Sequence, residues 1–142
     1  MSGGSTNAAI TVAASAAALR NSFPGDLGLE LLEISDDSVL GRLIVDSRHL
    51  HPGGYVHGGV WVALADTVAA WGTMRNLAAG ASFTTAELKM NVFTPGTVGD
   101  ELLAVGEPLH RGGRTQVWEV RVRNKERLAA NFICTQMVLH SP

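Results

Sequence analysis

The most regular apolar stretch of the chain lies in its middle, between Gly58 and Leu77. These residues are apolar almost all the way round a helical projection, whereas a helix on a protein surface carries a polar stripe. Asp66 is the only charged residue between His51 and Met74. We therefore predict a helix over Gly58 to Leu77, ended near Gly80, which the rest of the fold encloses and which carries one acid.

The segments on either side of this helix have patterns typical of strands and of one further helix. An alanine-rich segment from Asn7 to Phe23 favours a helix, which Pro24-Gly25 and Gly28 should end. Runs of β-branched and aromatic residues with partial alternation predict strands. The predicted strands are Leu29 to Ile34, Val39 to Val45, Thr84 to Phe93, Glu101 to His110, Thr115 to Arg123 and Leu128 to His140.

Turn-forming residues separate these strands, so neighbouring strands are expected to be antiparallel. Ser35-Asp36-Asp37-Ser38 joins the first two strands as a hairpin, and His51 to Val56 is a loop that leads into the central helix. The pattern predicts an α+β fold in which an antiparallel sheet curls around the buried helix. The β-branched run from Thr135 to Leu139 would leave an exposed sheet edge, and we therefore expect two chains to pair there.

Length, charge and composition narrow the classes of function. The chain has 142 residues, which predicts one domain over residues 1–142, with residues 1–27 as a helical extension. Its net charge of -2 and the lack of like-charge runs argue against nucleic-acid and membrane partners. The sequence lacks the pattern of a secretory signal, and we expect a cytoplasmic protein. Cys134, Trp61, Trp71 and Phe93 are interpreted as packing residues.

Asp66 and the start of its helix are the candidate chemistry. An ionised carboxylate without partners in an apolar environment is costly, so Asp66 either is hydrogen-bonded structurally or serves in a reaction. The first N–H groups of a helix lack acceptors and lie at the positive end of the dipole, and glycine at 58 lets a ligand approach them. Gly58 and Asp66 are about 12 Å apart along the helix axis, so one chain cannot flank one carbonyl with both. Two antiparallel helices across a two-fold axis could do so.

The motif His57-Gly58-Gly59 followed by Leu64-Ala65-Asp66-Thr67, with strands after it and then Pro95-Gly96 and Gly99-Asp100, resembles the hotdog-fold acyl-CoA thioesterases. The resemblance spans about Leu29 to Leu139. It is nearest to the branch with the phenylacetate-degradation thioesterases and the Arthrobacter-type 4-hydroxybenzoyl-CoA thioesterase. It implies an acyl-CoA substrate, no cofactor or metal beyond the coenzyme A of the substrate, and a homodimer with interfacial sites that pairs into a homotetramer.

The resemblance also implies roles for single residues. Asp66 matches the acid that attacks the thioester or activates water, and Gly58 matches the glycine whose N–H polarises the carbonyl. His57 matches the neighbouring histidine, for which we expect an orienting role. His51 stands where the family commonly has Asn or Gln, and a protonatable imidazole there would make activity depend on pH. Thr85 matches a hydroxyl that some relatives take from the following strand.

Two questions stay open from the residues alone. Arg111 and Arg114 flank Gly112-Gly113, and this turn suits coenzyme A phosphates, with Arg111, Gly113 and Arg114 as candidate contacts, but it is equally typical of a solvated hairpin tip. The same fold also serves non-catalytic acyl-CoA binding and the dehydration of hydroxyacyl thioesters. The His-Gly-Gly helix start favours hydrolysis over both. The acyl group, aromatic or aliphatic, is not set by the sequence.

Overall fold

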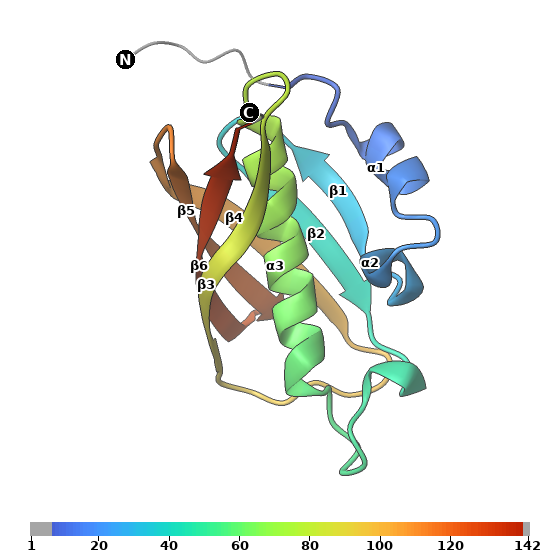
Figure 1. Cartoon of the computed structure of the whole chain (residues 1–142). Coiled ribbons are helices and arrows are strands. Elements are labelled where there is room, and N and C mark those ends of the chain that lie inside the picture. The colour runs from blue at the N-terminus through green and yellow to red at the C-terminus, as the bar shows by residue number, and fades with distance from the viewer. Residues whose placement is uncertain (1–6, 141–142) are drawn as a thin grey trace.

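The computed structural model describes residues 7–140 and confirms an α+β fold, an antiparallel sheet around a central helix (Figure 1). The six strands follow the order β1-β2-β4-β5-β6-β3 across the sheet. Their bounds are β1 Glu30–Ile34, β2 Val39–Ile44, β3 Ser82–Val92, β4 Glu101–Arg111, β5 Thr115–Asn124 and β6 Arg127–Leu139. All neighbouring strands are antiparallel, and the predicted strands are confirmed to within two residues at each end.

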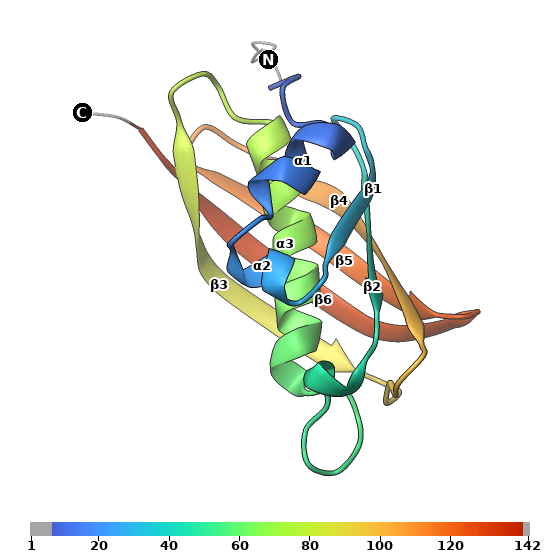
Figure 2. The same cartoon turned by 90° about the vertical axis from the view of Figure 1, so that its right-hand side faces the viewer.

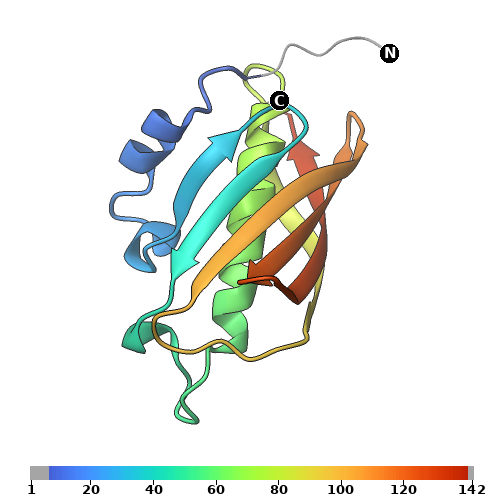
Figure 3. The ribbon, with the colours of Figure 1, turned by 180° about the vertical axis from the view of Figure 1, so that it is seen from behind.

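The central helix α3 spans Gly58–Arg75, two residues shorter at its end than predicted. It crosses the concave face of the sheet and packs against β2 to β6. Figure 3 shows the molecule from the other side, with the convex face of the sheet toward the viewer. Its apolar character all round is confirmed, but its own chain does not enclose it completely. Val62, Asp66, Thr67, Ala70 and Met74 form a half-buried stripe on its open side. No helix within residues 7–140 has the length and apolar composition of a membrane span.

Missing side chains at the helix–sheet contact let α3 lie close to the sheet. A Cβ atom on Gly41 of β2 or Gly106 of β4 would stand 2.5 and 2.9 Å from the two methyl groups of Val68. A Cβ atom on Gly72 of the helix would stand 2.5 to 2.8 Å from three ring carbons of Trp118, which is fully buried. The glycines therefore set the distance between the helix and the strands, because any larger residue would push the two apart.

The N-terminal segment forms two short helices, so the prediction of one helix from Asn7 to Phe23 is wrong. Helix α1 spans Val12–Ala18 and α2 spans Phe23–Asp26, with Asn21 between them in the left-handed region. Pro24 lies in the first turn of α2, where proline is favoured, and therefore begins a helix instead of ending one. The predicted stop at Gly28 is confirmed by its positive φ. Both helices lie on the β1 side of α3 (Figure 2).

The expected exposed edge at Thr135 to Leu139 is also wrong. This run belongs to β6, which is hydrogen-bonded to β5 on one side and to β3 on the other. The edge strand on this side of the sheet is β3, because the chain returns from the helix to the outside of β6. A β-bulge between Thr85 and Glu87 interrupts the pairing of β3 with β6, and beyond it Leu88 lies opposite Cys134. The free edge is thus 11 residues long and carries exposed apolar side chains.

Three of the four residues interpreted as packing residues lie in the core. Trp61, Trp71 and Cys134 are buried. Phe93 is 56% exposed, so its interpretation as a core residue is wrong for the single chain. It follows directly after the edge strand β3, where no further strand covers it. Phe93 therefore belongs to the same open surface as the end of β3.

The close contact between Gly72 and Trp118 predicts that Gly72→Ala is destabilising. Alanine favours a helix by about 1 kcal/mol over glycine, but overpacking a filled core costs about 1 to 3 kcal/mol. Because the added methyl group would overlap an immobile buried ring, we expect a net loss of about 1 kcal/mol in the free energy of unfolding. Urea denaturation would measure it. Gly113→Ala, where a Cβ atom meets nothing within 4 Å, is the control and should leave stability unchanged.

Candidate active site

The carboxylate of Asp66 lies halfway along α3 and is held by a neutral hydroxyl group. The helix turns Asp66 toward the edge strand, where Thr85 Oγ1 lies 2.8 Å from Asp66 Oδ1. Asp66 is half-buried and has no ion pair among the residues that the structure describes. Asp66 is thus hydrogen-bonded on one side and accessible on the open side of the helix. Thr85 is the residue that the family resemblance matches to a strand hydroxyl.

Burial controls the protonation of Asp66. The apolar surroundings raise the pKa of the carboxyl group, because they disfavour its charged form. The hydrogen bond from Thr85 lowers the pKa and offsets part of this effect. No positive charge contributes. A carboxylate in this setting is more basic than one in water, as a group that must take up a proton or attack a carbonyl requires.

Cys134 and Gln136 lie beside this pair, and Gln136 is not among the site residues predicted from the sequence. Gln136 is fully buried on β6, directly opposite Thr85, and Thr85 Oγ1 lies 2.9 Å from Gln136 Oε1. Gln136 Nε2 lies 3.5 Å from Cys134 Sγ. Burial and the Asp66 carboxylate raise the pKa of the Cys134 thiol to about 12. The alternation of Phe132, Cys134 and Gln136 on the inner face of β6 is the signal that could have identified an inward-facing amide.

The start of α3 presents a backbone donor without an acceptor. His57 is the N-cap of the helix, and its Nδ1 accepts a hydrogen bond from Gly59 N at 2.8 Å. Val60 N and Trp61 N both reach His57 O. Gly58 N has no acceptor among residues 7–140, and a Cβ atom on Gly58 would meet nothing within 4 Å. The helix start can therefore bind an oxygen of a ligand, with His57 fixing its geometry.

Two histidines in the preceding loop have different surroundings. The ring of His51 is half-buried, stands edge-on to Tyr55, and its Nδ1 accepts from Gly53 N at 2.9 Å. A neutral His51 bound in this way carries its proton on Nε2, which leaves a donor comparable to that of an amide. His49 is fully buried, accepts from Asp46 N and bonds to Leu27 O, and its role is structural.

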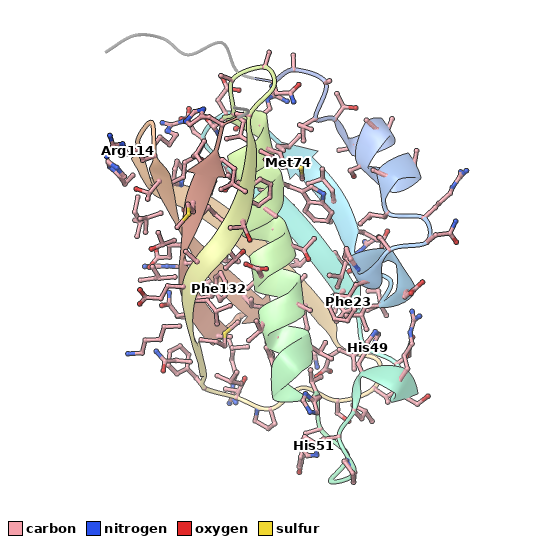
Figure 4. All side chains as sticks on the ribbon, in the orientation of Figure 1. Phe23, His49, His51, Met74, Arg114 and Phe132 are labelled. Carbon is pink, nitrogen blue, oxygen red and sulfur yellow. The ribbon has the colours of Figure 1, made fainter. Side chains whose placement is uncertain are left out.

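The predicted site residues lie in three separate places within one chain. Asp66 and Thr85 meet at the middle of α3, and His51, His57 and Gly58 lie near its start. Arg111, Gly113 and Arg114 lie on the hairpin between β4 and β5, and Figure 4 places Arg114 and His51 at opposite ends of the molecule. The chain alone therefore brings Asp66 and Thr85 together but not the helix start and Asp66.

The two arginines of the hairpin differ in their availability. Arg111 is bound to the turn between β1 and β2 and to the end of α3, through an ion pair with Asp37 at 2.9 Å and hydrogen bonds to Asp36 O and Asn76 Oδ1. Arg114 is exposed, and its guanidinium has no partner within the described part of the chain. The Gly113 carbonyl oxygen lies 3.1 Å from His140 Nε2. Arg111 thus has a clear structural role, and Arg114 is free to meet an anion.

The chain is similar to known proteins in both sequence and fold. Residues 53–130 match the family model of the thioesterase superfamily. The 1,4-dihydroxy-2-naphthoyl-CoA hydrolase of Listeria monocytogenes is 29% identical over 110 residues, 77% of this chain and 89% of that protein. A thioesterase from Haemophilus influenzae superposes with a TM-score of 0.86 at 27% identity and covers 92% of this chain and 91% of its own. A mutant of the phenylacetic acid degradation protein PaaI from Thermus thermophilus superposes with a TM-score of 0.74 at 27% identity. The match covers 81% of this chain and 96% of that protein.

Burial of Asp66 predicts that Asp66→Asn stabilises the folded chain at neutral pH. In the unfolded chain the carboxyl group ionises near its ordinary pKa of 3.8, whereas in the folded chain it ionises at a higher pH. Ionisation therefore costs stability as pH rises from about 4 through the raised pKa, by about 1.4 kcal/mol for each unit of the shift. Asparagine avoids this cost. Thermal unfolding from pH 3 to 8 should show that Asp66→Asn has a higher melting temperature than the unmodified protein near pH 8 but not near pH 3. Asp26→Asn, a substitution at an exposed position, is the control and should not raise the melting temperature.

Proposed function

The chain belongs to the thioesterase superfamily, and we propose that it hydrolyses an acyl-CoA to a carboxylic acid and free coenzyme A through Asp66 and the Gly58 N–H. The observation that carries this proposal is the carboxylate of Asp66, which has a raised pKa, a neutral Thr85 partner and no ion pair among residues 7–140. A structural acid on an apolar helix would be neutralised by a cation or by several backbone donors. Family membership favours hydrolysis over acyl-CoA binding alone and over dehydration.

Two chemical routes use the same residues. In the first, Asp66 takes a proton from water, the water oxygen bonds to the carbonyl carbon, the C–S bond breaks, and the leaving sulfur receives the proton. In the second, an Asp66 oxygen attacks the carbonyl carbon and expels the thiolate, and water then cleaves the mixed anhydride. The Gly58 N–H binds the carbonyl oxygen as it gains negative charge. His51 and Thr85 orient the thioester and the water, and His57 holds the helix start.

We place each site between two copies of the chain. About 12 Å along the helix separates Gly58 from Asp66, which is too far for both to reach one carbonyl group. Antiparallel pairing of two α3 helices would bring the start of one beside Asp66 of the other. The half-buried stripe of α3 and the free edge of β3, with exposed Leu88 and Val92, supply the apolar surface for such a dimer.

Further surfaces support a dimer of dimers and a place for coenzyme A. Leu109, Ile133 and Met137 are exposed large apolar residues of β4 and β6, which suits pairing of two dimers. The antiparallel arrangement also turns the β4–β5 hairpin of one copy toward the helix start of the other. There Arg114 and the Gly113 backbone would meet the phosphates of coenzyme A, while Arg111 holds the hairpin in place.

We propose that the acyl group is aromatic. The support is the similarity to the Listeria hydrolase, whose named substrate is an aromatic acyl-CoA, and the exposed Phe93 at the end of β3. Phe93 is free to pack against an aromatic ring at the surface between two copies, in the offset or edge-on geometry that such rings prefer.

Removing the carboxylate should abolish turnover while the fold remains. We expect Asp66→Asn and Asp66→Ala to lose about 10²- to 10⁴-fold or more in kcat/KM, the range for general acid–base catalysis. A panel of aromatic and aliphatic acyl-CoAs with a thiol-reactive dye would measure release of coenzyme A. Circular dichroism would show that the variants fold. Substantial activity in either variant would rule out the catalytic role of Asp66, and binding without release by the unmodified protein would point to a non-catalytic acyl-CoA-binding protein.

Gly58→Pro should remove the carbonyl-binding donor without disturbing the helix. Gly58 is the first residue of α3, where proline is favoured, and His57 has φ -62 and ψ 138, which a following proline accepts. We expect a loss of about 10²- to 10³-fold in kcat, as for removal of one oxyanion donor. Gly58→Ala keeps the N–H and is the matched control, which should retain more activity than Gly58→Pro.

The same variants test whether the site is shared between copies. Neither Gly58→Pro nor Asp66→Asn has an intact site as a homodimer. Random mixing by refolding should restore about a quarter of the wild-type turnover per site, because half of the dimers are mixed and each of these has one intact site. If both groups acted within one chain, mixing would restore nothing, and the shared site would be wrong.

A further inference from the structure

The hydroxyl group of Thr85 lies between two groups that both compete for its single proton. Thr85 Oγ1 is 2.8 Å from Asp66 Oδ1 and 2.9 Å from Gln136 Oε1. One hydroxyl proton cannot be donated to both oxygens at once. At the far end of the amide, Gln136 Nε2 lies 3.5 Å from Cys134 Sγ. The four side chains therefore form one line from the middle of β6 to the carboxylate on α3.

We propose that Gln136 is a positioning residue whose amide reverses a hydrogen-bond chain, so that Thr85 can hydrogen-bond to both the ionised and the protonated form of Asp66. This inference rests on the proposed function, in which Asp66 changes its protonation or its charge during the reaction. Gln136 is fully buried, and we assign it no contact with the thioester. It acts through Thr85, which it touches directly.

The two directions of the chain follow from the donors and acceptors of each group. When Asp66 is protonated, its O–H donates to Thr85, Thr85 donates to Gln136 Oε1, and Gln136 Nε2 donates to Cys134 Sγ. When Asp66 is ionised, Thr85 donates to Asp66, and a turned amide donates from Nε2 to Thr85. The thiol S–H of Cys134 then donates to Gln136 Oε1. An amide carries a donor and an acceptor of equal reach, so turning it satisfies both states; methionine or leucine could satisfy neither.

The hydrogen-bond chain through Thr85 and Gln136 is the main polar influence on the pKa of Asp66, because its other surroundings are apolar. The faces that β2, β4 and β5 turn toward the middle of α3 carry no charged side chain, and Arg111 of β4 reaches only the C-cap of the helix, Asn76. The buried members of these faces are Val39, Gly41, Leu43, Leu102, Ala104, Gly106, Gln116, Trp118, Val120 and Val122. On β3 and β6 the inward groups near Asp66 are Thr85, Gln136 and Cys134. Of these only the Cys134 thiol titrates, with a pKa of about 12, and it keeps its proton wherever Asp66 titrates. Arg75 lies at the end of α3 in an ion pair with Asp36.

Removal of the amide should raise the pKa of Asp66. Hydrogen bonds to a charged acceptor are about twice as strong as those between neutral groups, so the chain favours the ionised form more than the protonated one. We expect Gln136→Met to raise the midpoint of the Asp66 carboxyl ¹³C signal by about half a unit or more. The acid limb of the pH profile of kcat/KM should move by the same amount. Gln116→Met removes a buried amide from the adjacent position on β5 and is the matched control, with no shift expected.

A double-mutant cycle separates the effect of the hydrogen-bond chain on the pKa of Asp66 from a general effect on packing. In a Thr85→Val background, Gln136→Met should no longer move the Asp66 midpoint, because the link between them is absent. A shift of the same size in that background would overturn the proposal, and so would a change in melting temperature of Gln136→Met without any shift. The carboxyl titration does not need turnover. A shift of the Asp66 midpoint in a protein that releases no coenzyme A would therefore support the hydrogen-bond chain and reject the proposed function. Release of coenzyme A without such a shift would support the proposed function and reject the hydrogen-bond chain.

The unmodified protein provides a test that does not depend on folding of a variant. Because the amide turns when Asp66 changes its protonation, the Gln136 side-chain NH₂ resonances should titrate with the Asp66 midpoint. The same resonances should not move in Asp66→Asn, and those of Gln116, which accepts a hydrogen bond from Trp118, should not move in either protein. Gln136 resonances that stay constant through the Asp66 titration in the unmodified protein would overturn the proposal.

Discussion

The close seat of α3 on the curved sheet is the constraint from which the rest of the molecule follows. Gly41, Gly106 and Gly72 leave out the side chains that would hold the helix away, and Val68 and Trp118 fill the space between. A helix fixed this tightly cannot rotate, because every turn of it meets a close-packed surface. Its rotation decides that Asp66 points at the edge strand, and its length decides that the free N–H at its start is beyond the reach of that acid. In the proposed mechanism, the need for a second copy is thus a consequence of core packing.

Asp66 is held by groups that cannot neutralise it. Thr85 and Gln136 carry no charge, and the neighbouring thiol of Cys134 keeps its proton at neutral pH. An arginine or lysine beside Asp66 would lower the pKa of the carboxyl group, which would make it a weaker base. The arginine near the end of the helix, Arg75, is bound to Asp36. The arrangement therefore costs stability and keeps the carboxylate basic, as the proposed role of Asp66 requires.

The sequence predicted the elements well because each follows from local chemistry: the apolar run of α3, the turns between strands, and the lone acid all have a signal within a few residues. It failed where the outcome depends on distant parts of the chain. Thr135 to Leu139 has the composition of an edge strand, but only the return of β3 to its outer side decides that it is not one. Pro24 can end one helix or begin another, and the capping hydroxyl of Ser22 decides which. Gln136 meets Thr85 across 51 residues of chain, a pairing that no local pattern records.

The β-bulge at Ala86 divides β3 into two halves with opposite phase. Before it the odd-numbered Thr85 faces the helix, and after it the even-numbered Leu88, Met90 and Val92 lie opposite core residues of β6. Without the extra residue, the hydroxyl that holds the acid and the apolar edge could not share one face, and Glu87 and Lys89 would point inward instead. Divergence of this protein is therefore constrained in strand length as well as in residue type. An insertion or deletion of a single codon here would exchange the two faces of half a strand. Most substitutions at Ala86, an exposed position, would instead leave the pairing of β3 with β6 unchanged.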